Sequence, residues 1–484
     1  AVTSTATHRP VAVGRWRGET VPQLVAVDTA SADALLRGRP PGGATWGELT
    51  SALGPETPAP GLPLEVAPST GLTDLVLAGT GEGDGFPLRV TPTLVVEGGG
   101  GHRVTLVGEP LALDGAARAI VVPAQPGAVG PFELVGVRLA LELDPQASVA
   151  PQSAASTRVS VTISGPTAQP GATWTAARGD RMLGLWSTAA TSDDADVTAT
   201  GTVGLGGLAW EPAELVITAF EAPLVVPVLV TEELAAATAL RTGSSLTLSV
   251  GDGTVAAQVA GVVPYLPSVP RGPAVLADQD VLGRMLLARG DLTPLTDAWW
   301  VGLPATSTDD GAAAAAVEAA GLRVTADRSA ATAALLDGPL RVGVPAVLAV
   351  LVAAALLLAL AGTALHTAAA VDARALEVAR LQGVGVPRRS VVSALVLENV
   401  ALTVLVVVLG GGVGAAAAWA VAPVLATSQT GATPVPDVAV VWPWPAEVAL
   451  LAAFVLLPAA VVFPMATRLV RRATADHLRL DGPG

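Results

Sequence analysis

Three long apolar segments dominate the last third of the sequence. They span about residues 342–366, 391–421 and 447–467, and the second carries Glu398 near its start. A helix needs roughly 20 apolar residues to cross a bilayer, whereas an apolar stretch of about 10–14 is more typical of a buried core helix. The pattern therefore predicts three transmembrane helices in residues 341–484.

The preceding 340 residues have a different pattern, in which short apolar runs are separated by turns. Alternating runs between Gly- and Pro-rich turns over residues 56–220 predict a β-sandwich. Residues 1–55 and 221–340 instead mix strands with short helices. We therefore expect the two outer pieces to form one α/β core domain with the sandwich inserted between them. The predicted fold class is an α+β membrane protein, with this extracytoplasmic part followed by three transmembrane α-helices.

Within residues 221–340 several elements can be placed individually. Gly251-Asp252-Gly253 lies between two alternating runs and predicts a hairpin. A helix is expected near Asp278 to Arg289, and a further strand over Leu322 to Thr325. The pair Trp299-Trp300 is interpreted as strand core rather than as a platform for a ligand.

Composition divides the chain at the same place. Charged residues make up 14% of the sequence, against roughly 25% in soluble domains. Residues 341–484 hold nine of the 27 basic and seven of the 41 acidic residues, so most of the net charge of −14 lies before them. A purely soluble protein is excluded, and an acidic domain without a basic stripe disfavours nucleic acid as a partner.

The residue types that are missing restrict the chemistry. There is no cysteine, and every basic residue is arginine. A P-loop needs a lysine that reaches the β- and γ-phosphates, so any ATP hydrolysis would belong to a separate subunit. The arginine bias, with 52 Gly and 39 Pro, suggests a GC-rich bacterial genome.

No constellation of side chains predicts catalysis, a cofactor or a resident metal. Asp193, Asp194 and Asp196 could hold Ca²⁺ with other oxygens, but a solvated acidic loop is the preferred interpretation. The four histidines are dispersed along the chain. The predicted protein is therefore not an enzyme.

The distribution of arginines predicts the orientation in the membrane. The loop 367–390 and the tail 468–484 hold four arginines each, whereas the loop between the second and third spans holds no basic residue. Positive charge stays on the cytoplasmic side, so we expect a multi-pass protein of the cell membrane with residues 1–340 outside and its C-terminus in the cytoplasm. Export of residues 1–340 would require a further membrane helix before Ala1.

The loop 367–390 contains the most informative pattern in the chain. Asp372 is a plausible N-cap, and Glu377 with Arg380 could form an i,i+3 ion pair. Gly383 or Gly385 could end the helix in a left-handed cap. This spacing predicts a short amphipathic helix that lies at the cytoplasmic face between two spans.

These residues resemble the FtsX/MacB-type ABC transporter permeases. The shared features are an Arg-x-x-Glu, a glycine turn, and an Arg-Arg pair that leads into an apolar helix with a glutamate near its start. Gln382 stands where such sequences commonly have arginine. The residues that the resemblance assigns to the ATPase-coupling loop and the helix that follows are Arg374, Glu377, Arg380, Leu381, Gly385, Arg388, Arg389 and Glu398.

The resemblance implies a permease subunit whose loop meets a cytoplasmic ABC ATPase. The family unit has one span before its extracytoplasmic domain and three after it, so this chain corresponds to the unit without its first helix. Gly410 and Gly414, four residues apart, favour close helix packing, either within the chain or with a second permease half or a second copy. Export, lipoprotein handling and cell-wall regulation all remain open as roles.

Two other classes of protein stay as alternatives. One is a membrane-anchored binding or sensing protein whose β-sandwich recognises a glycan without any ATPase. The other is a membrane-tethered hydrolase, for which the sequence offers no acid–base pair.

Overall fold

A computed structural model gives the architecture of the chain. It describes residues 2–14, 16–36, 38–56, 61–67, 70–82, 87–98, 102–124, 132–147, 153–165, 174–178, 185–193, 196–251, 253–293, 295–303, 310–336, 339–425, 434–436 and 441–472. The chain forms two compact units, Ala1–Ser307 and Thr308–Gly484. Each unit is described by itself.

One sheet of the first unit is built from both ends of the unit. Its eight strands follow the order β2-β17-β18-β16-β19-β3-β1-β20. The parallel pairing of β3 with β19 joins the N-terminal segment to the residues that follow the sandwich. The strands are β1 (Val2–Pro10), β2 (Ala12–Val13), β3 (Gln23–Val27), β16 (Val226–Thr231), β17 (Ser245–Val250), β18 (Gly253–Val263), β19 (Ala274–Asp278) and β20 (Ala298–Val301).

Short helices accompany this sheet, and local capping explains where they begin. The Thr45 side chain accepts from the Glu48 amide while the Glu48 carboxylate accepts from the Thr45 amide, a complete capping box. The Asp278 carboxylate accepts from the amides of Asp280 and Val281. The helices are α1 (Ala32–Leu35), α2 (Trp46–Thr50), α4 (Glu232–Thr238) and α5 (Gln279–Ala288).

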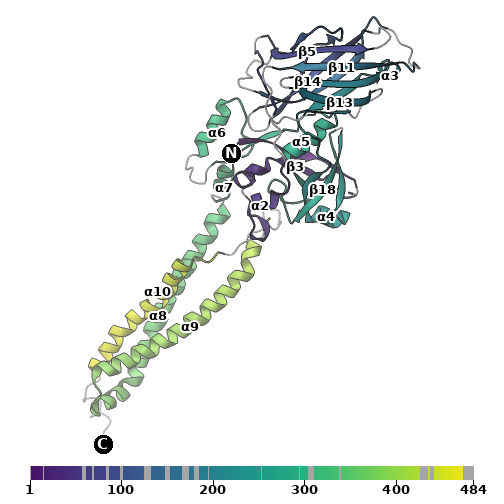
Figure 1. Ribbon diagram of the computed structural model, residues 1–484. Coiled ribbons are helices and arrows are strands. Elements are labelled where there is room, and N and C mark those ends of the chain that lie inside the picture. Colours follow the sequence, from purple (N-terminus) through teal and green to yellow (C-terminus); the bar gives the residue numbers. More distant parts are fainter. Residues whose placement is uncertain are drawn as a thin grey trace, which may run out of the picture. The chain divides into compact units, whose positions relative to one another are not determined.

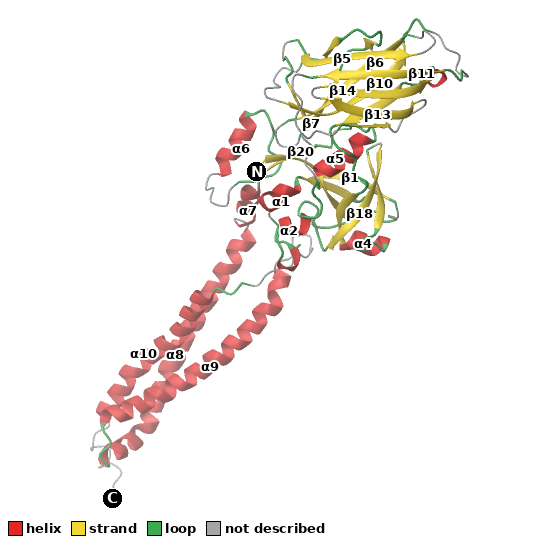
Figure 2. Cartoon of the chain, viewed as in Figure 1, coloured by secondary structure: helices red, strands yellow, loops and turns green. Residues whose placement is uncertain are grey.

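The remaining strands of the first unit form two antiparallel sheets that share one apolar core (Figure 2). Leu94, Leu139 and Ile217 from the first sheet meet Leu77 and Val161 from the second, and all five are buried. The first sheet contains β4 (Leu62–Leu64), β6 (Leu88–Glu97), β7 (Arg103–Val107), β8 (Leu111–Ala112), β10 (Phe132–Leu143), β12 (Thr175–Arg178) and β15 (Ala213–Thr218). The second contains β5 (Leu72–Glu82), β9 (Arg118–Val121), β11 (Ser156–Ser164), β13 (Leu185–Asp193) and β14 (Asp196–Gly204), and the short α3 (Leu205–Leu208) follows β14.

Three predictions for single elements of residues 221–340 had different outcomes. The hairpin at Gly251 is confirmed, because β17 and β18 pair antiparallel on either side of it. The strand expected over Leu322 to Thr325 is wrong: that segment has no regular structure. The interpretation of Trp299 and Trp300 as core is also wrong, because β20 is an edge strand and neither side chain is buried.

The second unit consists of helices (Figure 1). Its two short helices are α6 (Asp310–Ala319) and α7 (Arg328–Leu336), and its three long ones are α8 (Pro339–Gly383), α9 (Arg388–Leu425) and α10 (Trp444–Arg472). The stretches that are long and apolar enough to cross a membrane are Pro345–Ala369, Arg388–Ala422 and Trp444–Arg468. The predicted class, mixed α and β with three apolar helices at the C-terminal end, is confirmed.

Deleting a side chain from the sandwich core gives a direct test of this packing. We expect Leu139→Ala to destabilise the first unit by about 2–5 kcal/mol, because Leu139 is fully buried and its loss leaves a cavity. The control Val107→Ala removes methyl groups from a half-exposed position and should cost less than about 0.5 kcal/mol. Pulse proteolysis of the full chain in a urea series measures both, and equal midpoints would contradict the assignment.

Candidate functional site

The helix that the sequence places at the cytoplasmic face is the end of a much longer one. α8 runs without interruption from Pro339 to Gly383. The prediction of a separate short helix with Asp372 as its N-cap is therefore wrong. No Gly or Pro occurs between Gly362 and Gly383, and the segment is rich in alanine and leucine, which favour helix over any break.

The reversal from α8 to α9 is a Schellman turn. Gly385 has φ +92°, the left-handed conformation that glycine adopts most readily. The amide of Val386 donates to the Leu381 carbonyl at 3.1 Å, and the amide of Gly385 donates to the Gln382 carbonyl at 3.0 Å. These are the two hydrogen bonds of this motif. The predicted glycine cap is thus confirmed at Gly385.

An ion pair ties the two helices together above this turn. The Arg374 guanidinium on α8 donates to both oxygens of Glu398 on α9, at 2.8 and 3.1 Å. Such a two-bond geometry fixes orientation as well as distance. Glu398 and the nearby Glu377 both raise the pKa of Arg374.

The partnership of Arg374 with Glu398 was not predicted, although both residues were singled out. The missing signal was their position: each lies at a similar number of residues from Gly385, on opposite sides of the turn. In an antiparallel helix pair such residues face one another. The predicted pair of Glu377 with Arg380 is not formed within 4 Å among the described residues, where Glu377 instead acts on Arg374.

The third helix is joined to the same place. Val378 and Ala379 of α8 form a small buried cluster with Val391 of α9 and Val470 of α10. The Gln382 side chain donates to the Val470 carbonyl at 3.2 Å. Gln382, the position that departs from the family pattern, therefore links α8 to α10.

The outer face of the turn is left open. The side chains that project from it are Glu377, Arg380, Leu381, Val384, Arg388 and Arg389, and all six are exposed. Buried valines thus hold the turn from inside, the half-exposed ion pair links its two helices, and its outer surface presents charged and apolar groups.

Gly410 and Gly414 lie on α9, away from this turn. Both are exposed, and a Cβ built on either would meet nothing within 4 Å. They therefore do not mediate packing among α8, α9 and α10, and their role in contacting another chain remains a prediction.

Other chemistry is sparse in the part of the chain that the structure describes. No three His, Asp or Glu side chains there come close enough to hold a metal ion. Asp194 of the candidate Ca²⁺ triplet lies outside the described residues.

A charge exchange tests the ion pair. We expect Arg374→Glu to lower the melting temperature of the chain in detergent, because it places two carboxylates together, and Arg374→Glu/Glu398→Arg to recover most of the loss. Arg389→Glu, a charge reversal at an exposed position of the same turn, should have little effect. A double variant as unstable as the single one would show that the pair does not connect the helices.

Comparison with known proteins identifies this region. No curated protein matches the chain. Residues 349–473 match the family model described as FtsX-like permease C-terminal, an interval that begins within α8 and continues just past the end of α10. The turn, the ion pair, α9 and α10 lie inside it, and so does α8 apart from its first ten residues. The C-terminal part of this chain is therefore an FtsX-like permease domain of the kind found in ABC-transporter-type permeases, as the loop motif predicted.

Proposed function

We propose that the chain is the transmembrane permease subunit of an FtsX/MacB-type ABC transporter, and that the turn at Gly385 contacts a separate cytoplasmic ATPase. The observation that carries the proposal is the construction of this turn within the matched family domain. The valine cluster fixes it from inside, the half-exposed Arg374–Glu398 pair links its two helices, and its outer face is exposed. A partner that binds a rigid, exposed turn moves the attached helix, whereas a partner that binds a flexible loop only bends the loop.

Because α8 is continuous, it can carry a movement of the turn across the membrane. A helix of 45 residues is roughly 65–70 Å long at about 1.5 Å per residue. Displacement at Gly383 is therefore transmitted along one hydrogen-bonded rod as far as Pro345, a proline near the start of the helix, without a flexible joint at the membrane surface.

The electrostatics of α9 also favour a partner at this place. Arg388 and Arg389 occupy the first turn of α9, which contains no acidic residue. Cations at a helix N-terminus oppose the helix dipole. Two exposed arginines that weaken their own helix are well placed to bind carboxylates of a partner protein or lipid phosphates.

The orientation follows from where the positive charges gather. The hydrogen bond from Gln382 to Val470 brings the end of α10 beside the turn. The arginines of the turn and Arg468, Arg471 and Arg472 of α10 thus lie at one end of the three-helix group. By the positive-inside rule this end is cytoplasmic and residues 1–340 are outside. ATP hydrolysis then takes place on the partner.

Thiol labelling tests the orientation in a chain that has no cysteine of its own. Leu224→Cys and Val384→Cys place single thiols at positions that are 91% and 86% exposed. We expect a membrane-impermeant maleimide to label only Leu224→Cys in intact cells, and both variants after permeabilisation. Labelling of Val384→Cys from outside would contradict the proposed topology.

Two substitutions at the turn test its coupling to an ATPase. Valine at Gly385 is strained because the backbone is left-handed there, and Glu377→Arg reverses an exposed charge. We expect both to lower ATP hydrolysis by the co-purified complex roughly five- to tenfold, within the range of coupling common between sites. The measurement uses the full chain isolated in mild detergent from its native host.

Gly362→Val is the matched control for this experiment. It makes the same change in α8, at a helical position with nothing within 4 Å of the new Cβ, and should retain both partner and activity. Wild-type chain that co-purifies with no P-loop ATPase would instead favour the anchored binding protein.

A further inference from the structure

Arginines without a partner gather at the end of the long helices that carries the turn. Residues 370–400 and 460–472 hold seven arginines against three carboxylates, and one arginine, Arg374, is bound to Glu398. The others whose side chains the structure describes are Arg380, Arg388, Arg389, Arg468 and Arg471. All five are exposed, and among the described residues none of them forms an ion pair or a side-chain hydrogen bond. The fold therefore leaves this positive charge to an anionic partner.

Two of these arginines border the contact between α9 and α10. Val391 of α9 and Val470 of α10 belong to one buried cluster. Arg388 lies three residues before Val391, and Arg471 directly follows Val470. Residues three apart share one face of a helix, so Arg388 lies on the side of α9 that packs against α10. The two arginines thus flank the same seam, although they are far apart in the chain.

The outer face of α10 joins this charge to an apolar surface. Leu457, Pro464, Arg468 and Arg471 follow one another at intervals of seven, four and three residues, which places them on one face of the helix. All four are exposed. This face is apolar along the span and positive at its end. An anionic phospholipid has the same polarity when its acyl chains lie beside Leu457 and its phosphate beside Arg468.

The limits of the spans place these arginines at the depth of lipid phosphates. The stretches that are long and apolar enough to cross a membrane begin at Arg388 on α9 and end at Arg468 on α10. The headgroups lie directly outside the hydrocarbon core, and an arginine at this boundary reaches them with its charged end while its stem stays in apolar surroundings. Arginine also binds phosphate oxygens through two parallel hydrogen bonds.

A soluble protein is better served by the turn than by this seam. Leu381 and Val384 are 48% and 86% exposed and lie more than ten residues beyond the span of α8, which ends at Ala369. They are accessible to a partner in the cytoplasm. Arg388, Arg468 and Arg471 instead continue the surface that the spans present to lipid.

We propose that the seam between the start of α9 and the end of α10 binds an anionic phospholipid, whose phosphate accepts hydrogen bonds from Arg388, Arg468 and Arg471. The bound lipid bridges two helices beside the turn and offsets the repulsion among their arginines. The inference rests on the proposed function only where it assigns this lipid to the cytoplasmic leaflet.

A lipid titration of the full chain, produced without any ATPase and followed in detergent by native mass spectrometry, tests the proposal. The probes are phosphatidylglycerol and the zwitterionic phosphatidylcholine with the same acyl chains. We expect phosphatidylglycerol to bind roughly tenfold or more tightly, because it alone carries net charge toward the arginines. Equal binding of the two lipids would overturn the proposal. Displacement of phosphatidylglycerol by inorganic phosphate would also overturn it, since the seam would then bind a free anion rather than a lipid.

Single charge removals locate the bound lipid. Arg388→Gln and Arg471→Gln should each weaken the binding of phosphatidylglycerol about fivefold, the effect of one arginine near a charged membrane surface. Arg380→Gln is the matched control: it removes the same charge from the same end, but helical spacing places Arg380 on the opposite side of α8 from the buried Val378 and Ala379. It should bind the lipid as the native chain does.

Two outcomes of this series contradict the assignment. Equal weakening by all three variants would show diffuse attraction instead of a site at the seam. Unchanged affinity in Arg388→Gln and Arg471→Gln, at unchanged melting temperatures, would show that the lipid binds elsewhere. Because the titration contains neither an ATPase nor an intact membrane, its failure would leave the tests of coupling and orientation unaffected, and their failure would leave the lipid affinities unchanged.

Discussion

A lipid bilayer supplies no hydrogen-bond partners, and the C-terminal unit is built around this constraint. Every backbone amide inside the hydrocarbon must be satisfied within its own segment, which leaves long helices as the solution. The chain can reverse only where water returns, and there it must still satisfy the last carbonyls of α8. The Schellman turn at Gly385 does both in a few residues. The approach of α8 and α9 beside the turn, and hence the ion pair of Arg374 with Glu398, depends on it.

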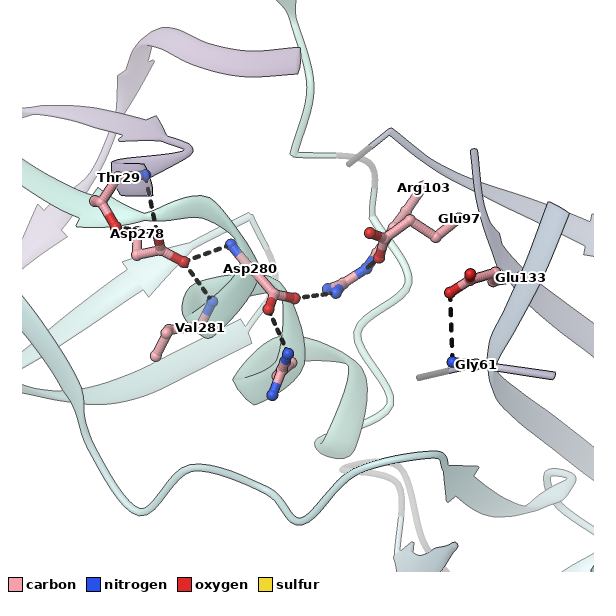
Figure 3. Close-up of polar contacts among 9 residues, drawn as sticks. Thr29, Gly61, Glu97, Arg103, Glu133, Asp278, Asp280 and Val281 are labelled. Carbon is pink, nitrogen blue, oxygen red and sulfur yellow. Dashed lines mark hydrogen bonds and ion pairs between the residues drawn. The ribbon is translucent and has the colours of Figure 1, made fainter. Parts of the chain in front are cut away.

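The first unit folds in water rather than in lipid, and other interactions stabilise it. Its sandwich buries alternate side chains of two sheets, whereas its eight-stranded sheet joins segments separated by about two hundred residues through main-chain pairing. The two parts meet at a buried apolar cluster that includes Val95, Phe220 and Leu287. Beside it, Arg103 from β7 reaches Asp280 on α5 (Figure 3), and Arg284 covers the ring of Phe220.

At the proposed coupling turn, the residues that hold the fold are distinct from those that are exposed to a partner. At the turn, buried valines and the Arg374–Glu398 pair fix the backbone, so that exposed residues are left for a partner.

Local patterns were enough to predict the three spans, the sandwich and a glycine cap at Gly383 or Gly385, because each depends on local periodicity or on one residue's backbone preference. It also singled out Arg374 and Glu398 through a motif. Other features depend on contacts between distant parts of the chain, which sequence periodicity does not encode. The uninterrupted α8 replaced a helix capped by Asp372, since one favourable cap does not outweigh a continuous run of helix-forming residues. The strand β1, polar and without alternation, exists because β3 and β20 offer its backbone partners on both sides. The pairing of Arg374 with Glu398 is a property of distance in space, and only the folded chain sets that distance.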